Sequence, residues 1–256
     1  MKLRPAELLL KDLGITDPRE IGLEAIALDQ RAIVKHGTLD GCEARIVGYG
    51  SRAIITVDDR KPWTRQRFST AHELGHWKHH RGRYLVCRPD ELSDLRSNSL
   101  DPEQIADFYA ADLLLPRYLF VPRAVALRLS TFEAVEILSR EYSTSISATA
   151  IRLAQYGPEP AMLVCHGPEG RKWFNRPQQI PERWFPRDDL SADSSAMNVL
   201  YGMNRFGRRS TVGAEAWFDR WDASRYELYE QSFKISDQEV LTFLVFTNAE
   251  MLEDIA

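Results

Sequence analysis

Residues 64–80, TRQRFSTAHELGHWKHH, decide how the N-terminal part of this chain folds. We predict that they form one helix (Thr64–His80), because cationic residues close the stretch and Gly82 follows it, as is typical of a helix C-terminus. Within the helix, residues 72–76 read HELGH, which is an H-E-x-x-H pattern. Four residues rotate a helix by about 400°, so His72 and His76 project from one face and can reach the same ion.

The H-E-x-x-H pattern is typical of zinc sites in peptidases. Zinc lowers the pKa of a bound water to about 7 and polarises the scissile carbonyl of a peptide. Glu73 lies beside the face of the two histidines, where its carboxylate can take the water proton and pass it to the leaving amine. The pattern therefore predicts a zinc hydrolase with His72 and His76 as ligands and Glu73 as the general base. The alternative is a pair of ordinary surface histidines.

The residues around the pattern favour a helix that faces other elements. A small or apolar stripe accompanies the histidines at helical spacing, and it consists of Phe68, Ala71, Gly75 and His79. Gly75 leaves room for another element to approach closely, although a glycine is also tolerated in a helix at a cost of about 1 kcal/mol. Four residues could donate a hydrogen bond to a developing oxyanion, but each is interpreted as structural: His79, His80, Tyr84 and Tyr109.

A third zinc ligand is expected from a second helix over residues 101–114. This helix is predicted because Asp101 is an N-cap residue and Pro102 suits the first helical position. Catalytic zinc usually takes three protein ligands, and Glu103 in the first turn is the candidate for the third. Asp107 shares the face of Glu103 and could accept a hydrogen bond from the N–H of a ligand histidine. On the pattern alone, Glu103 could equally well serve only its own helix N-terminus.

Two sequence blocks resemble the ImmA/IrrE family of metallopeptidases. Residues 65–76, RQRFSTAHELGH, match the family pattern R-x-R-F-[ST]-x-A-H-E-[LI]-[GS]-H, and residues 103–116, EQIADFYAADLLLP, are similar to E-x-x-A-N-x-F-A-A-x-L-L-M-P. The resemblance implies that Glu103 is the third metal ligand, with Zn2+ as the ion and Mn2+ as the alternative. Asp107 stands where the family often has Asn, and a carboxylate there still suits a contact with a histidine.

The same resemblance implies a function and a partner. Members of the family act on helix-turn-helix repressors of the Xre type, which they cleave or antagonise so that stress, mobile-element or toxin–antitoxin genes are released. We therefore expect an endopeptidase whose substrate is such a transcriptional repressor. The alternative is a non-proteolytic metal-binding regulator that controls its partner by holding it.

A third hypothesis is direct DNA binding through residues 132–156, which have some similarity to a helix-turn-helix. A helix, a turn rich in Ser and Thr, and a second helix follow one another there. DNA binding needs basic residues that meet phosphates, whereas three glutamates outweigh two arginines in this segment. Direct nucleic-acid binding is therefore not expected, and these helices are expected to pack against the peptidase core.

The chain is expected to have an α+β fold with two domains. The sequence GPEP at 157–160 is the best boundary, because Gly and Pro interrupt regular structure. It separates a zincin-like metallopeptidase domain with a helical extension (1–157) from a smaller, strand-rich domain (160–256), which the family resemblance suggests is GAF-like and sensory. The aromatic residues of that domain are interpreted as core. The other helices that we expect span residues 5–13, 119–129, 132–140 and 148–155. The expected strands span residues 42–49, 52–58, 161–165, 172–175, 215–218, 228–235 and 240–246. Residues 83–100 are expected to be a loop.

The composition, 44% hydrophobic and 27% charged over 256 residues, is that of a globular protein with a sizeable core. A net charge of −4 argues against binding long polyanions over the whole surface. No window reaches the roughly 18 apolar residues of a membrane span, and the start, MKLRPAELLLKDLG, is not expected to be a signal peptide. Cys42, Cys87 and Cys165 are widely spaced, which indicates free thiols in a reducing compartment. We therefore expect a soluble, cytoplasmic protein without a membrane partner.

Overall fold

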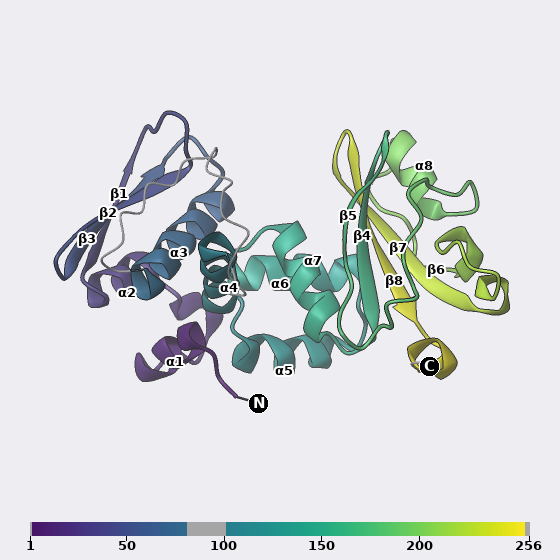
Figure 1. The fold of residues 1–256 in the computed structure, drawn as a ribbon, viewed down its shortest axis with the longest axis horizontal. Coiled ribbons are helices and arrows are strands. Elements are labelled where there is room, and N and C mark those ends of the chain that lie inside the picture. The colour runs from purple at the N-terminus through teal and green to yellow at the C-terminus, as the bar shows by residue number, and fades with distance from the viewer. Residues whose placement is uncertain (1, 81–100, 254–256) are drawn as a thin grey trace. The chain divides into compact units, whose positions relative to one another are not determined.

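The computed structural model describes residues 2–80 and 101–253 (Figure 1). The predicted loop at 83–100, with Tyr84 and Cys87, lies outside the described residues. By its packing, the chain divides into two compact units. The first contains the residues up to Phe120 together with Glu141–Ser145, and the second contains Val121–Arg140 and the residues from Ile146 onward. The boundary predicted at 157–160 falls inside the second unit, and the two-domain division at that point stays a prediction.

The first unit contains a three-stranded sheet with the order β1-β3-β2. Strand β1 (Ala32–Gly37) pairs in parallel with β3 (Arg52–Asp58), which pairs in turn with β2 (Ala44–Tyr49) in antiparallel register. The β2–β3 hairpin was predicted from branched residues on both sides of a Gly-containing turn, and it is confirmed. Gly50 in that turn has φ +59°, a left-handed conformation that glycine adopts without strain.

This unit contains the helices α1 (Pro5–Asp12), α2 (Leu23–Asp29), α3 (Trp63–His79) and α4 (Pro102–Leu114). The first residues of α5 (Arg117–Leu127) and the last two of α6 (Phe132–Tyr142) also belong to it. Helix α3 packs on one face of the sheet, against β2 and β3. A Cβ atom at Gly48 would lie 2.8 Å from the ring of Trp77, so the absence of a side chain there lets α3 approach the sheet. The indole N–H of Trp77 also donates a hydrogen bond to the carbonyl of Gln30 at 2.8 Å.

A buried ion pair fixes α1 beside the start of α5. The side chain of Glu7 is completely buried, and its Oε1 accepts a hydrogen bond from the backbone N–H of Arg117 at 2.7 Å. The guanidinium of Arg117 reaches the other carboxylate oxygen at 2.5 Å. Because both oxygens have strong donors, the buried charge is compensated.

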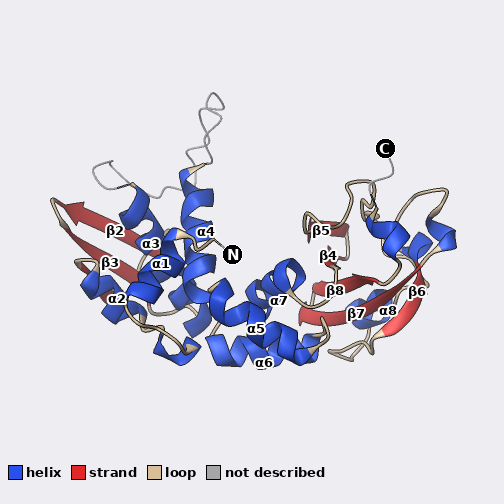
Figure 2. Ribbon diagram, turned by 90° about the horizontal axis from the view of Figure 1, so that it is seen from below, coloured by secondary structure: helices blue, strands red, loops and turns tan. Residues whose placement is uncertain are grey.

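The second unit is built on a five-stranded antiparallel sheet with the order β5-β4-β8-β7-β6. The strands are β4 (Ala161–Gly167), β5 (Gly170–Asn175), β6 (Ser210–Gly213), β7 (Glu227–Ser236) and β8 (Glu239–Phe246). Figure 2 draws these strands in red. Every residue of β4 is buried, which explains why its first five residues are a continuous apolar run rather than an alternating one.

Helices cover both faces of this sheet. On one face, α8 (Ser195–Tyr201) packs with the aromatic residues around Trp184, which belong to the core as predicted. The same prediction is wrong for Phe185 and Trp221, whose side chains are 55% and 84% exposed. On the other, Phe132 at the start of α6 (Phe132–Tyr142) stacks on Phe233 with ring centroids 5.2 Å apart, and α7 (Ile146–Tyr156) contacts β4. The expectation that the segment 132–156 packs against the peptidase core is therefore corrected for α7 and for α6 up to Arg140, which belong to the second unit, whereas Glu141–Ser145 belong to the first.

The strand predicted at 215–218 is wrong. The chain forms a short 3-10 helix over Ala214–Ala216, and the backbone N–H of Trp217 donates to the carbonyl of Ala214 at 3.0 Å. Trp217 and the neighbouring Phe218 are both buried, whereas consecutive residues of a strand point to opposite faces. A tight turn is the conformation that turns both rings into the same core.

The fold is mixed α+β, with a helical domain that carries the first sheet followed by a strand-rich C-terminal region, as predicted. Over the residues that the structure describes, none of the helices combines the length and the apolar character that crossing a membrane requires.

Candidate metal centre

The candidate site lies where α3 and α4 pack against each other. A Cβ atom at Gly75 would lie 2.9 Å from the Cα of Ala106 and 3.1 Å from the Cβ of Tyr109. Real Cβ atoms do not come that close to a neighbouring backbone, so only glycine allows this helix spacing. The close approach expected at Gly75 is thus confirmed. It brings the first turns of α4 over the middle of α3.

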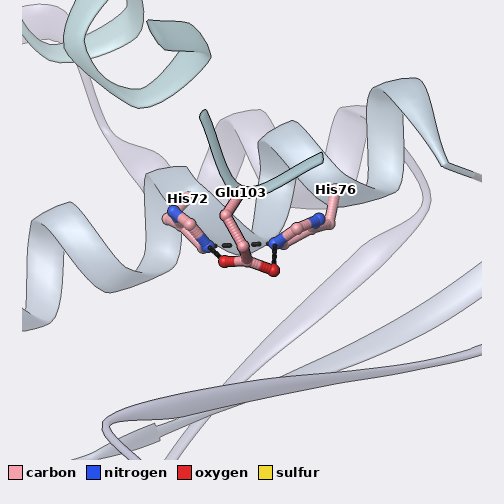
Figure 3. A group of neighbouring side chains, drawn as sticks. All are labelled: His72, His76 and Glu103. Atoms are coloured by element: carbon pink, nitrogen blue, oxygen red, sulfur yellow. Dashed lines mark hydrogen bonds and ion pairs between the residues drawn. The ribbon is translucent and has the colours of Figure 1, made fainter. Parts of the chain in front are cut away.

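Three side chains converge at this crossing (Figure 3). Nε2 of His72 lies 2.9 Å from Nε2 of His76 and 3.1 Å from Oε2 of Glu103. Oε1 of Glu103 lies 3.3 Å from Nε2 of His76. Ligands about 2.0–2.1 Å from a tetrahedral ion are separated from one another by about 3.3 Å. The three groups therefore have the spacing of three corners of a tetrahedral metal site, and they form a group that could hold a metal ion.

The hydrogen bond of His72 to Asp107 settles how the imidazole is oriented. Nδ1 of His72 lies 2.9 Å from Oδ1 of Asp107. A carboxylate only accepts hydrogen bonds, so Nδ1 carries the proton and donates it. Burial alone would lower the pKa of His72, but the hydrogen bond and charge of Asp107 raise it above its usual value. The Nε2 atom of His72 faces Nε2 of His76 and the carboxylate of Glu103, both of which are electron-rich. A proton or a metal cation must compensate the repulsion between these groups.

His76 is completely buried, and its second nitrogen faces another histidine. Nδ1 of His76 lies 3.2 Å from Nδ1 of His80, which is one helical turn further along the chain. Burial, and then the charge of His72, lower the pKa of His76 and favour the neutral imidazole that binds metals. This contact is absent from the sequence-based predictions, although the spacing of four residues between His76 and His80 could have indicated it.

The remaining residues considered as oxyanion donors occupy different surroundings. The ring of His79 lies edge-on against Tyr109, with centroids 5.5 Å apart. Tyr109 is buried, and burial raises the pKa of its hydroxyl to about 12. Both side chains thus contribute to the packing between α3 and α4, in keeping with their structural interpretation.

Glu73 differs from every other carboxylate near the crossing. Its side chain is 2% exposed, and its Oε2 atom has no hydrogen-bond partner among the described residues. Burial raises its pKa to about 7, with a smaller opposing influence from His72 and a smaller further rise from Glu103. A carboxyl group with such a pKa can both accept and release a proton near neutral pH.

The candidate site lies within a domain that matches a known family. Residues 22–154, just over half of the chain, match the model of the IrrE N-terminal-like domain, Peptidase_M78. A solved structure, that of a Mycobacterium tuberculosis transcriptional regulator, is similar with a TM-score of 0.67 and 13% identity over 96% of this chain and 75% of that chain. At this identity the similarity shows the fold alone. No curated protein matches the chain. The matched domain spans α3, α4 and the whole candidate site, and the chain belongs to the family of IrrE N-terminal-like domains.

Proposed function

We propose that the protein is a zinc-dependent endopeptidase in which His72, His76 and Glu103 bind the ion. The observation that carries this proposal is the convergence of two imidazole nitrogens and one carboxylate within 3.3 Å of one another at the crossing of α3 and α4. Two imidazoles with one glutamate are a common ligand set of catalytic zinc in peptidases. Manganese is the alternative ion.

In this proposal Glu73 is the general base. Bound zinc would polarise the scissile carbonyl and acidify the attacking water. Glu73 would accept a proton from that water and return it to the leaving amine. Its burial and raised pKa suit both transfers. Its Oε2, which has no partner in the part of the chain that the structure describes, leaves an acceptor for the water proton. Asp107 would hold His72 in the tautomer that presents Nε2 to the ion, and His80 would orient His76.

The proposed substrate is a helix-turn-helix transcriptional repressor of the Xre type, so that cleavage would release stress, mobile-element or toxin–antitoxin genes in the cytoplasm. Membership of a peptidase family, together with a structural neighbour named as a transcriptional regulator, supports a regulatory protease. The strand-rich region is proposed to be a GAF-like sensory domain. The second candidate is a metal-binding regulator that holds its repressor without cutting it.

Metal content tests the ligand set. Elemental analysis of the purified protein should find about one zinc per chain, and the variants His72→Ala and Glu103→Ala should lose it. Glu24→Ala is a matched control, because Glu24 also lies in the first turn of a helix and its side chain is 54% exposed, as is that of Glu103. A folded wild type that takes up no added zinc would exclude the proposed metal centre.

Cleavage tests the reaction. The purified protein would be incubated with each Xre-type repressor encoded in its source genome, and new termini would be identified by mass spectrometry. The wild type should cut one of them, and Glu73→Gln should not. If Glu73→Gln relieves repression in cells as well as the wild type does, the non-proteolytic regulator is the correct reading.

A further inference from the structure

The two faces of the three-stranded sheet in the first unit have very different surroundings. On the face that α3 covers, Ile46, Ile55 and Val57 are buried. On the opposite face, hereafter the outer face, Ile33, Ile54 and Val47 are 53%, 40% and 64% exposed. Isolated apolar side chains are common on protein surfaces, but contiguous ones mark interaction sites.

These three exposed side chains are contiguous because the strand register aligns them. Ile33 of β1 pairs with Ile54 of β3, and Ile54 pairs with Val47 of β2. They form one row across the whole width of the sheet. Paired residues of neighbouring strands have Cβ atoms about 4.5–5.5 Å apart, so the row is a continuous apolar strip about 10 Å long.

Basic residues flank this strip on both sides. In the next row on one side, Lys35 and Arg45 lie on either side of Thr56. On the other side Arg52 pairs with the exposed Tyr49. The structure records no ion pair for these three cations within residues 2–80 and 101–253. The outer face is thus locally positive on a chain whose net charge is −4.

We propose that the outer face binds an acidic amphipathic helix of a partner protein. A helix laid on a sheet is the usual way in which an apolar sheet face is covered. Two helical turns measure about 11 Å, so one apolar stripe of such a helix would match the length of the strip. Acidic residues on both sides of that stripe would lie against Lys35 and Arg45 on one side of the strip and against Arg52 on the other side.

The chemistry of the outer face favours a protein helix over other ligands. Nucleic-acid interfaces are more polar and more strongly basic than a strip of three aliphatic side chains. Membrane-surface binding uses helices or chains that insert into the bilayer, whereas these side chains stand on a pleated sheet. This inference is independent of the peptidase activity, because none of the residues involved belongs to the metal centre.

The test uses a displayed random peptide library of about 15 residues, enough for roughly four helical turns. The full-length wild type is the target, and the variant Val47→Asp serves to remove peptides that bind elsewhere. The surviving peptides should carry apolar residues at spacings of three and four with acidic residues beside them. Their affinity should fall on the order of tenfold or more with the double variant Lys35→Glu and Arg45→Glu, which takes no part in the selection.

Leu8→Asp is the matched control, because Leu8 is an exposed apolar residue on α1 and should not affect binding. Retained zinc and an unchanged circular dichroism spectrum establish that the variants are folded. No surviving peptide, or survivors without an acidic bias, would overturn the proposal. Self-association, or binding to phosphatidylglycerol vesicles or duplex DNA, that is lost with Val47→Asp would also overturn it by identifying a different occupant.

Discussion

Two buried glutamates, Glu230 in the second unit and Glu73 in the first, have opposite surroundings. In the second unit, Glu230 accepts hydrogen bonds from the hydroxyl of Ser194 at 3.0 Å, the backbone N–H of Ser195 at 2.5 Å and the indole N–H of Trp217 at 2.9 Å. In the first unit, Glu73 keeps an oxygen that has no hydrogen-bond partner within residues 2–80 and 101–253. Burying an unpaired acceptor costs roughly 1–3 kcal/mol, so the comparison separates a carboxylate that stabilises the fold from one that the fold keeps available.

The largest effect is expected from Glu73→Gln. The amide has the same shape but cannot accept and release the water proton, so cleavage of the repressor should fall by about 10²–10⁴-fold. Zinc content should stay the same, and the free energy of unfolding should not fall, because a buried, unpaired charge is removed. Single-turnover cleavage and urea denaturation measure the two quantities. A large loss of stability would show that Glu73 resembles Glu230 after all.

The same replacement in the second unit, Glu230→Gln, should have the reverse outcome. The amide nitrogen cannot accept a hydrogen bond, so a donor from Ser195 or Trp217 is left unsatisfied in the core. We expect a loss of about 2 kcal/mol in the free energy of unfolding. Zinc content should be unchanged. The denaturation midpoint tests this, and an unaltered midpoint would contradict the role given to Glu230.

Asp107→Ala tests whether the carboxylate at the edge of the site orients the ligand His72. Without the acceptor for its Nδ1–H, His72 can turn or change tautomer, so zinc affinity should fall on the order of tenfold. Competition with a fluorescent chelator measures this affinity. Asp107→Asn keeps an acceptor oxygen and should restore most of the affinity. Equal affinities in the wild type and Asp107→Ala would mean that the contact does not orient the ligand.

The smallest effect is the pH-dependent part of the stability that comes from Glu7, a buried carboxylate of the first unit that is fully paired. Burial alone would raise its pKa, but the hydrogen bonds from Arg117 and Arg4 lower it below 4.5. Its contribution to stability is therefore complete above about pH 4.5 and is lost as the pH falls through the lowered pKa. Glu7→Gln should destabilise the metal-free protein at about pH 7 but much less at about pH 3. Urea denaturation at both values tests this, with Glu24→Gln as the exposed control. A pH-independent difference would contradict the assigned ion pair.

The sequence predicted those features that depend on local spacing. The facing of His72 and His76 follows from four positions of one helix, and the bounds of α4 follow from its N-cap. The contact of Glu103 with His72 spans 31 positions, so the local pattern left the role of Glu103 open and the family resemblance decided it. The parallel pairing of β1 with β3 and the row of Ile33, Ile54 and Val47 depend on register between separate segments. No local pattern in the sequence contains the register. The strand predicted at 215–218 is wrong for a similar reason, because the packing of the Trp217 and Phe218 rings decides the conformation there.

The 31 positions between His72 and Glu103 also have a thermodynamic consequence. An ion bound at the crossing of α3 and α4 would be a removable crosslink between two distant segments of the chain. Closing a loop of that length in the unfolded chain corresponds to about 3–4 kcal/mol by the chain-entropy argument used for disulfides. Chelation would then loosen the tertiary link between the two helices while leaving each of them helical, so metal supply would set the lifetime of the folded protein as well as its activity.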